Sequence, residues 1–137
     1  MRRDQIAVGQ ELGPLRRLVT QEKINAYAEA SGDFNPIHVD PEFARKTPYG
    51  GTIAHGFLTV AYLSEMMTQC FGKGWISGGR MEVAFRAPVK PGSTVTVRGT
   101  VVEIAQEGDR ARAECEVWCE VDDGTRVLTG RASALLE

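Results

Sequence analysis

The sequence predicts an α+β domain in which a curved antiparallel sheet wraps around one buried helix. Residues 57–71 are strongly apolar and long enough for a helix of about four turns. From about residue 77 onward, apolar and polar residues alternate as they do in half-buried strands. No repeat, low-complexity tract or linker interrupts the chain, so we expect one domain over residues 1–137.

The composition excludes several classes of partner. The chain is 42% hydrophobic and 25% charged, with a formal net charge of −2. Nucleic acid is therefore not expected, because binding to phosphate backbones usually needs a basic face. No apolar run approaches the roughly 20 residues of a membrane span, and the start of the chain lacks the apolar stretch of a signal peptide. We expect no membrane partner and a cytoplasmic location.

The three cysteines, Cys70, Cys115 and Cys119, carry no recognisable chemistry in their spacing. Their number is odd and no C-x-x-C pair occurs, so neither a disulfide framework nor a zinc site is indicated. Cys115 and Cys119 fall on the apolar face of an alternating segment. They are interpreted as small buried residues rather than nucleophiles.

The first half of the chain carries helix and loop signals. A strand interrupted by glycine and proline is expected over 8–19. Thr20 suits the N-cap of a helix over 21–30, since its hydroxyl can accept a hydrogen bond from an unpaired backbone N–H. Residues 33–53 resemble a loop, within which 41–46 can start a short helix with proline in its first turn.

The second half contains the helix and the sheet. The first two turns of the 57–71 helix are apolar on nearly all sides, which predicts that it is buried on all sides; Gly72 and Gly74 should end it. The pair Asp123-Gly124 is typical of a two-residue hairpin. Strands are expected over 80–87, 94–98, 111–121 and 126–135.

The most informative stretch is S-G-D-F-N-P-I-H-V-D at 31–40. It sets the Asp33 carboxylate and the His38 imidazole five residues apart, across a turn made by Asn35 and Pro36. Proline fixes its own backbone angle and restricts the residue before it, while Asn35 can bond its own backbone. Two titratable groups held by a rigid turn are what acid/base catalysis requires.

Other interpretations of these side chains remain open. Asp33 alone fits the turn after a helix, and His38 alone fits a loop histidine with satisfied hydrogen bonds. His55 fits a structural role near a helix cap. A metal site of Asp33, His38, Asp40 and His55 is available, but no recognised ligand spacing supports it.

A second chemical element precedes the apolar helix, in the segment G-G-T-I-A-H-G at 50–56. The first N–H groups of a helix have no partner within the helix and carry partial positive charge. Gly56 has no side chain, so a ligand oxygen can approach closely. A thioester carbonyl placed there would be polarised, and an enolate would be stabilised, by a backbone oxyanion hole.

Together, the 31–40 motif and H-G-F-L at 55–58 resemble the MaoC-like hydratase family, the (R)-specific enoyl-CoA hydratases of the hot dog fold. The stretch M-E-V-A-F-R-A-P-V-K-P-G at 81–92 is also similar to that family, and the resemblance extends over most of the chain. It implies that Asp33 and His38 activate water and that the Gly56 N–H binds the thioester carbonyl. It also implies that Ser64 lies near the site and orients Asp33, although a lone serine there more often bonds back to its own helix.

The resemblance further implies a homodimer whose two sheets join edge to edge, and an acyl-CoA thioester as substrate, with no metal or redox cofactor. Asn35, Phe57 and Leu58 are predicted to contact the substrate. The CoA phosphates need surface cations, for which the candidates are Arg45, Lys46, Arg86 and Lys90.

The implied reaction is hydration of a trans-2-enoyl-CoA to the (3R)-hydroxyacyl-CoA, or its reverse. Asp33 is favoured as the base and His38 as its partner, although one shared water leaves the two roles interchangeable. Two alternatives stay open. One is a (3R)-hydroxyacyl dehydratase acting on acyl carrier protein in fatty-acid synthesis. The other is a non-catalytic acyl-CoA binding module on the same fold.

Overall fold

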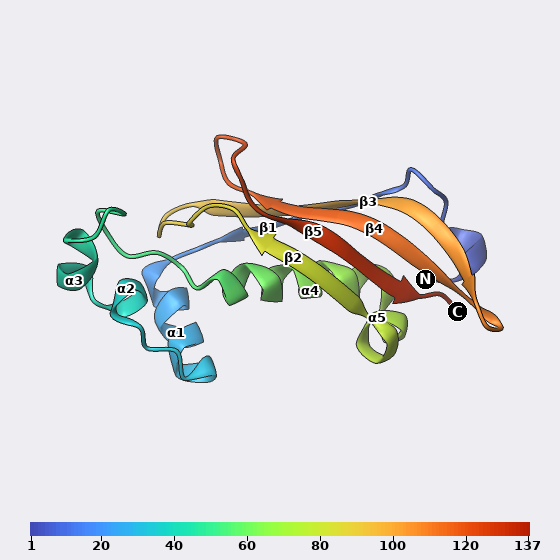
Figure 1. The fold of residues 1–137 in the computed structure, drawn as a ribbon, viewed down its shortest axis with the longest axis horizontal. Helices are drawn as coiled ribbons and strands as arrows, with labels where there is room; N and C mark the ends of the chain where they lie inside the picture. The colour runs from blue at the N-terminus through green and yellow to red at the C-terminus, as the bar shows by residue number, and fades with distance from the viewer.

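The computed structural model describes all 137 residues and confirms the α+β class. Five antiparallel strands form one curved sheet in the order β1-β3-β4-β5-β2, and helices lie on its concave side (Figure 1). A three-residue 3-10 turn, Arg3–Gln5, precedes β1. The strands are β1 (Glu11–Leu18), β2 (Arg80–Phe85), β3 (Thr94–Glu107), β4 (Arg110–Glu120) and β5 (Arg126–Leu135).

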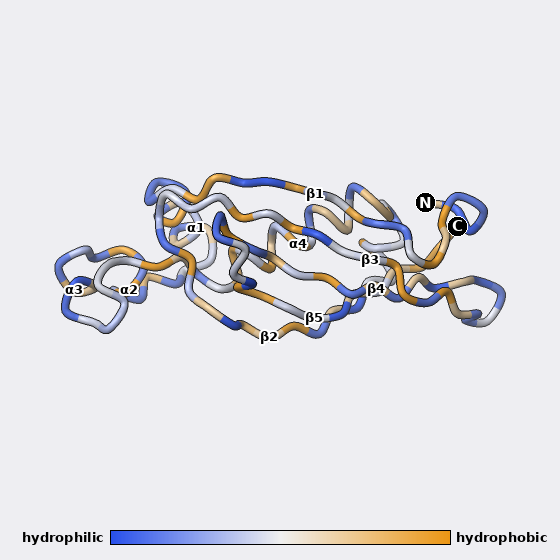
Figure 2. Tube along the Cα trace, turned by 90° about the horizontal axis from the view of Figure 1, so that it is seen from above, coloured by the Kyte–Doolittle hydropathy of each residue, from blue (hydrophilic) through white to orange (hydrophobic).

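The strands follow the alternation in the sequence, with three main differences. Strand β3 continues to Glu107, well beyond the expected end at residue 98. Strand β1 starts at Glu11, later than expected, and its pairing with β3 shifts between Leu12 and Leu15, around the Gly13–Pro14 bond. The turn between β4 and β5 spans 121–125 rather than two residues, because the Asp123 carboxylate accepts a hydrogen bond from the Thr125 N–H. Polar and apolar residues alternate along the sheet when it is seen from above (Figure 2).

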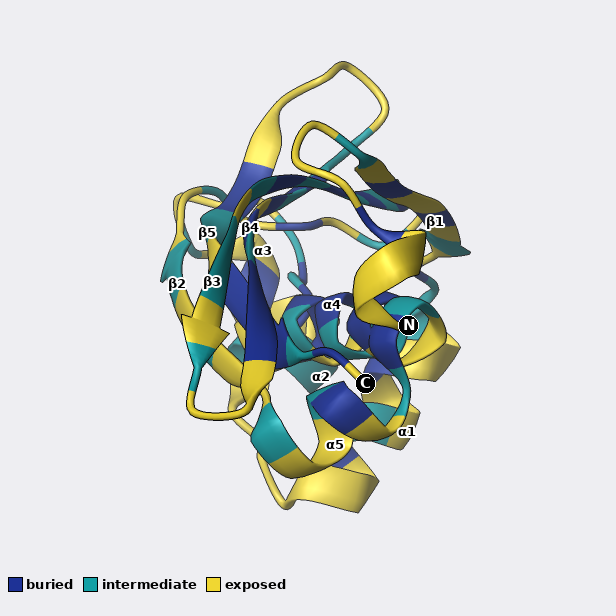
Figure 3. Ribbon diagram, turned by 90° about the vertical axis from the view of Figure 1, so that its right-hand side faces the viewer, coloured by how far each residue is buried: buried dark blue, intermediate teal, exposed yellow.

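Helix α4 (Gly56–Phe71) runs along the concave face of the sheet, and the core lies between them (Figure 3). Leu63, Met66 and Met67 of the helix are buried against the inward side chains of the strands. The apolar first turns predicted a helix that is buried on all sides, and this prediction is wrong. Phe57 is 63% exposed, because no element of this chain covers that side of the first turn.

Three further helices gather at one end of the sheet, around the start of α4 (Figure 1). Helix α1 (Gln21–Ser31) begins at Thr20, whose hydroxyl accepts from the Lys23 N–H, which confirms the predicted cap. The loop expected over 33–53 contains two helices instead of one, α2 (Pro36–Val39) and α3 (Pro41–Arg45).

At the opposite end, Gly72 stops α4 as predicted, and a further helix, α5 (Lys73–Gly78), follows it. The Arg112 side chain, on β4, is buried where α5 meets the sheet. Its guanidinium donates to both carboxylate oxygens of Glu107, to the Gly78 carbonyl and to the Ser133 hydroxyl. No helix in the structure is both long enough and apolar enough to cross a bilayer.

Candidate active site

The segment that carries Asp33 and His38 is folded by its own side chains. Gly32 ends α1 in the left-handed conformation, with φ of 79°. The Asp33 Oδ1 atom accepts from the Asn35 N–H at 3.2 Å, and the Asn35 side chain accepts from the Ile37 N–H at 3.1 Å. These bonds, with Pro36 at the first position of α2, form the rigid turn that the sequence predicts.

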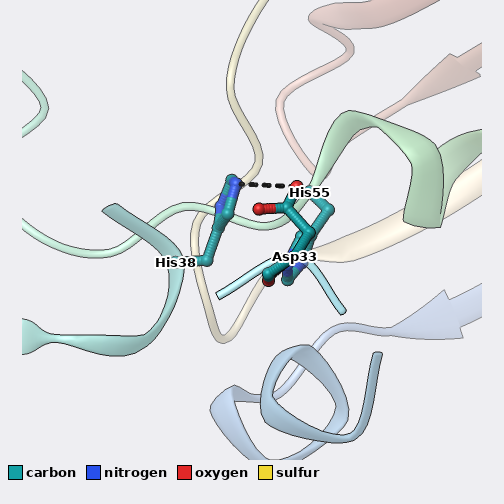
Figure 4. Close-up of side chains that lie close together, drawn as sticks. All are labelled: Asp33, His38 and His55. Atoms are coloured by element: carbon teal, nitrogen blue, oxygen red, sulfur yellow. Dashed lines mark hydrogen bonds and ion pairs between the residues drawn. The ribbon is translucent and has the colours of Figure 1, made fainter. Parts of the chain in front are cut away.

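The turn brings the acid and the imidazole together (Figure 4). His38 Nε2 lies 4.0 Å from Asp33 Oδ2, while His38 Nδ1 lies 2.8 Å from the Ile53 carbonyl oxygen. A nitrogen beside a carbonyl must donate, so Nδ1 carries a ring hydrogen; in the neutral imidazole, Nε2 then presents its lone pair toward the carboxylate. The His38 side chain is 12% exposed and that of Asp33 is 51% exposed.

The start of α4 supplies an unpaired donor. Gly56 is the first residue of this 16-residue helix, and its N–H has no acceptor within the chain. The Phe85 ring packs against the Cα of Gly56, since a Cβ added to Gly56 would be 2.7 Å from Phe85 Cε1. Phe57 meets the same ring edge to face, with centroids 5.8 Å apart. Gly56 and these two aromatic rings line one cavity.

A cavity of about 370 Å³ joins His38 to the start of α4, and Asp33 is not among the residues that line it. His38, His55 and Gly56 line it, together with the side chains of Phe57 and Phe85. Four further residues that the sequence did not indicate also line the cavity: Tyr49, Thr59, Phe85 and Val127. Only Phe85 carried a usable signal, because it stands in the family-like stretch at 81–92.

The remaining predicted site residues lie elsewhere. Leu58 is buried in the core and is not part of the cavity wall, and Asn35 acts as the cap of α2. Ser64 accepts a hydrogen bond from Trp75 Nε1 at 2.9 Å and forms none with Asp33, in contrast to the predicted orienting role. Ser64 lies two turns into α4, and its hydroxyl faces α5. The sequence did not predict this contact between the two helices.

Among the candidate cations, Arg86 lines the cavity, and its Nε donates to the Thr129 hydroxyl at 2.9 Å. Arg45 is instead paired with Glu42 within α3. Burial raises the pKa values of the Cys115 and Cys119 thiols to about 12, which agrees with their interpretation as apolar core residues.

The geometry of the two histidine rings bears on whether these residues could form a metal site. Asp33, His38 and His55 each offer a ligand atom, and these atoms lie within 4.8 Å of one another. The two imidazole rings are stacked, however, with centroids 3.9 Å apart and planes inclined by 26°. In-plane lone pairs of stacked rings do not converge on one ion at the roughly 2 Å of a metal–nitrogen bond. The Asp40 carboxylate caps α3 instead.

Fold and site together define a class: a hot dog fold protein with a carboxylate–imidazole pair whose imidazole shares a cavity with an unpaired helix N-terminus. Residues 4–122 match the profile of the MaoC like domain family, and the chain belongs to that family. This confirms the family resemblance seen in the sequence.

The chain is similar over much of its length to curated proteins named as dehydratases or hydratases. A 3-hydroxyacyl-thioester dehydratase Z of Mycobacterium tuberculosis is 42% identical over 95 residues, which are 66% of this chain but only 63% of that protein's length. A 3-hydroxybutyryl-CoA dehydratase of Methylorubrum extorquens is 38% identical over 119 residues, covering 86% of this chain and 73% of the relative. An (R)-specific enoyl-CoA hydratase of Aeromonas caviae is 32% identical over 128 residues and covers 93% and 92% of the two chains.

Solved structures agree on the fold. The (R)-hydratase from A. caviae involved in PHA biosynthesis superposes with a TM-score of 0.82 at 29% identity, covering 96% of this chain and 98% of that one. A monoamine oxidase regulatory protein from Archaeoglobus superposes with a TM-score of 0.83 at 29% identity, covering 99% and 94%.

Proposed function

We propose that this protein is a hydro-lyase that adds water reversibly to a trans-2-enoyl-CoA and gives the (3R)-hydroxyacyl-CoA. The observation that carries the proposal is the 4.0 Å separation between Asp33 Oδ2 and His38 Nε2, with His38 lining the same cavity as Gly56. The curated names of the relatives, dehydratase or (R)-specific hydratase, support the same reaction in its two directions.

The separation suits one water molecule bound between two acceptors. At 4.0 Å the two atoms are too far apart for a direct hydrogen bond, but each can accept a hydrogen from one water placed between them. In the neutral imidazole, His38 Nε2 carries the lone pair when Nδ1 donates to the Ile53 carbonyl. Asp33 Oδ2 is free, because the Asn35 N–H binds the other oxygen. A water that donates both hydrogens directs its lone pairs away from the pair and is oriented as a nucleophile.

The reaction then balances without a further reactant. The water oxygen attacks C3 while one member of the pair removes a proton from it. The electrons of the C2–C3 double bond move to the thioester oxygen, where the unpaired Gly56 N–H stabilises the enolate. The proton returns from the pair to C2 on the same face, and the reverse sequence releases water. Either group can be the one that takes the proton, because both contact the same water.

The walls of the cavity fit the rest of the substrate. Phe57 and Phe85 offer apolar surface to the acyl group, and they are exposed by 63% and 54% in the single chain. Arg86 offers a cation at the same cavity for the anionic carrier. We also propose a homodimer, since β2 is an edge strand and ends at the exposed Phe85. Sedimentation of the purified chain tests this, and a monomer at micromolar concentration would contradict it.

The activity is tested by following the loss of enoyl absorbance of crotonyl-CoA and longer enoyl-CoAs with purified protein. Asp33→Asn and His38→Ala should each lower kcat by at least about 10²-fold, the scale for removing a general acid or base. Asp109→Asn is the matched control, because this exposed carboxylate lies at the β3–β4 turn, at the far end of the sheet. Binding of enoyl-CoA without turnover would favour the binding module, and turnover only on acyl carrier protein would favour the fatty-acid dehydratase.

A further inference from the structure

His55 is a buried histidine for which the proposed water addition has no chemical use. It directly precedes α4 and is 2% exposed, yet its side chain makes no capping bond to the helix. The ring turns instead toward the segment that carries Asp33. His55 Nε2 lies 2.9 Å from the Asp33 backbone carbonyl oxygen, so Nε2 carries the ring hydrogen and donates it there.

The same ring also supports His38. The two imidazoles stack with centroids 3.9 Å apart, and the ring of Tyr27, on α1, packs against His55 with centroids 4.8 Å apart. Nδ1 of His55 is buried without a hydrogen-bond partner, which fits the tautomer in which Nδ1 bears only a lone pair. One side chain therefore contacts both members of the acid/base pair, and its backbone leads directly into Gly56.

The two members of the pair do not depend on His55 equally. The segment around His38 has other ties, because the Ile53 N–H donates to the Ile37 carbonyl and the Gln21 side chain donates to the His38 carbonyl. Residues 33–36 make only local hydrogen bonds within 28–40, apart from the one from His55. Half of the Asp33 side chain faces solvent, so packing does not replace that bond.

We propose that His55 is a positioning residue that fixes the distance between Asp33 Oδ2 and His38 Nε2, through its hydrogen bond to the Asp33 backbone and its stacking on His38. The inference rests on the proposed hydration, in which this distance sets the geometry of the bound water. Displacement of a catalytic group by about 1 Å costs about 10²-fold in rate. Loss of the donor should therefore lower kcat, while binding of the thioester at Gly56 and the apolar walls should change little.

Two substitutions separate the donor from the bulk of the ring. His55→Phe keeps an aromatic ring for the stack and for Tyr27 but has no donor. His55→Gln loses the ring but places an amide N–H near the position of Nε2. We expect His55→Phe to lower kcat by about 10- to 100-fold with KM within about threefold, and His55→Gln to recover most of that loss. Tyr27→Phe is the matched control, because it keeps the aromatic ring that packs against His55.

A second readout does not depend on turnover. Hydrogen–deuterium exchange of a peptide covering 31–40 should be faster in His55→Phe than in His55→Gln, while peptides from α4 exchange alike. If His55→Phe does not fold, His55→Asn replaces it, since its shorter amide does not reach the Asp33 carbonyl.

The outcomes distinguish this inference from the proposed function. Wild-type kcat in His55→Phe, or equal losses of kcat in the Phe and Gln variants, would overturn the positioning role. Unchanged exchange of 31–40 in the Phe variant would also overturn it. A wild-type protein without hydratase activity would refute the proposed function, and the exchange experiment would then decide alone whether His55 holds the Asp33 segment.

Discussion

Gly56→Ala tests the oxyanion hole with a single methyl group. A Cβ at this position would lie 2.7 Å from Phe85 Cε1 and 2.8 Å from Cδ1. The Phe85 ring must therefore retreat by about 0.7 Å, the difference between 2.7 Å and the 3.4 Å at which ordinary contact begins. Because the ring is half exposed, it can move at small cost to the fold, and alanine is otherwise favourable in a helix.

The expected effect is therefore on turnover rather than on stability. The new methyl group and the displaced ring both occupy the approach to the Gly56 N–H. We expect kcat for crotonyl-CoA to fall by about 10²- to 10³-fold, the scale for losing one oxyanion-hole donor. The free energy of unfolding in urea should change by less than about 1 kcal/mol.

Two further variants make the test specific. Gly51→Ala is the matched control, because a Cβ there meets nothing within 4 Å and the turnover number should be unchanged. Gly56→Ala combined with Phe85→Leu removes the clash with the ring and should recover part of the activity if ring displacement contributes. A folded Gly56→Ala protein with near-normal kcat would refute the assignment of this N–H to the thioester oxygen.

Two other predictions concern the core. Arg112→Met removes a buried guanidinium that donates to the Gly78 carbonyl and the buried Ser133 hydroxyl. It should lower the free energy of unfolding by about 1–3 kcal/mol in urea titration, because these acceptors lose their donor; an unchanged free energy of unfolding would contradict this. Burial raises the pKa of the Cys70 thiol, and it raises the pKa values of the Cys115 and Cys119 thiols to about 12. A thiol reagent at about pH 8 should therefore label Cys115 and Cys119 only after denaturation. Rapid labelling of either residue in the native protein would contradict their burial.

Much of the fold could be predicted because periodicity depends on local sequence. Alternation over 111–121 gave β4, the apolar run at 57–71 gave α4, and the hydroxyl of Thr20 marked the start of α1. The proximity of Asp33 and His38 was also predictable, since the intervening turn is closed by hydrogen bonds between residues two apart in the sequence. Each of these features depends on residues that lie close together in the sequence.

The contacts that complete the site are long-range, and no local pattern contains them. Phe85 reaches Gly56 from an edge strand, and the Ile53 carbonyl selects the tautomer of His38 from 15 residues away. Exposure of Phe57 was missed for a related reason. Apolar periodicity shows that a helix side avoids water, but it does not show whether the same chain covers it.

Ser64 shows how this limit changes a functional prediction. The family resemblance implies that Ser64 orients Asp33, whereas its hydroxyl accepts the indole N–H of Trp75 and ties α4 to α5. Ser64→Ala should therefore leave that donor unpaired and lower the free energy of unfolding by about 1–3 kcal/mol. Turnover of crotonyl-CoA should stay within about threefold of wild type, because no bond to Asp33 is lost. Trp75→Phe removes the other partner and should reproduce both results. A folded Ser64→Ala protein whose kcat falls by about 10²-fold, beside a fully active Trp75→Phe protein, would restore the serine to the active site.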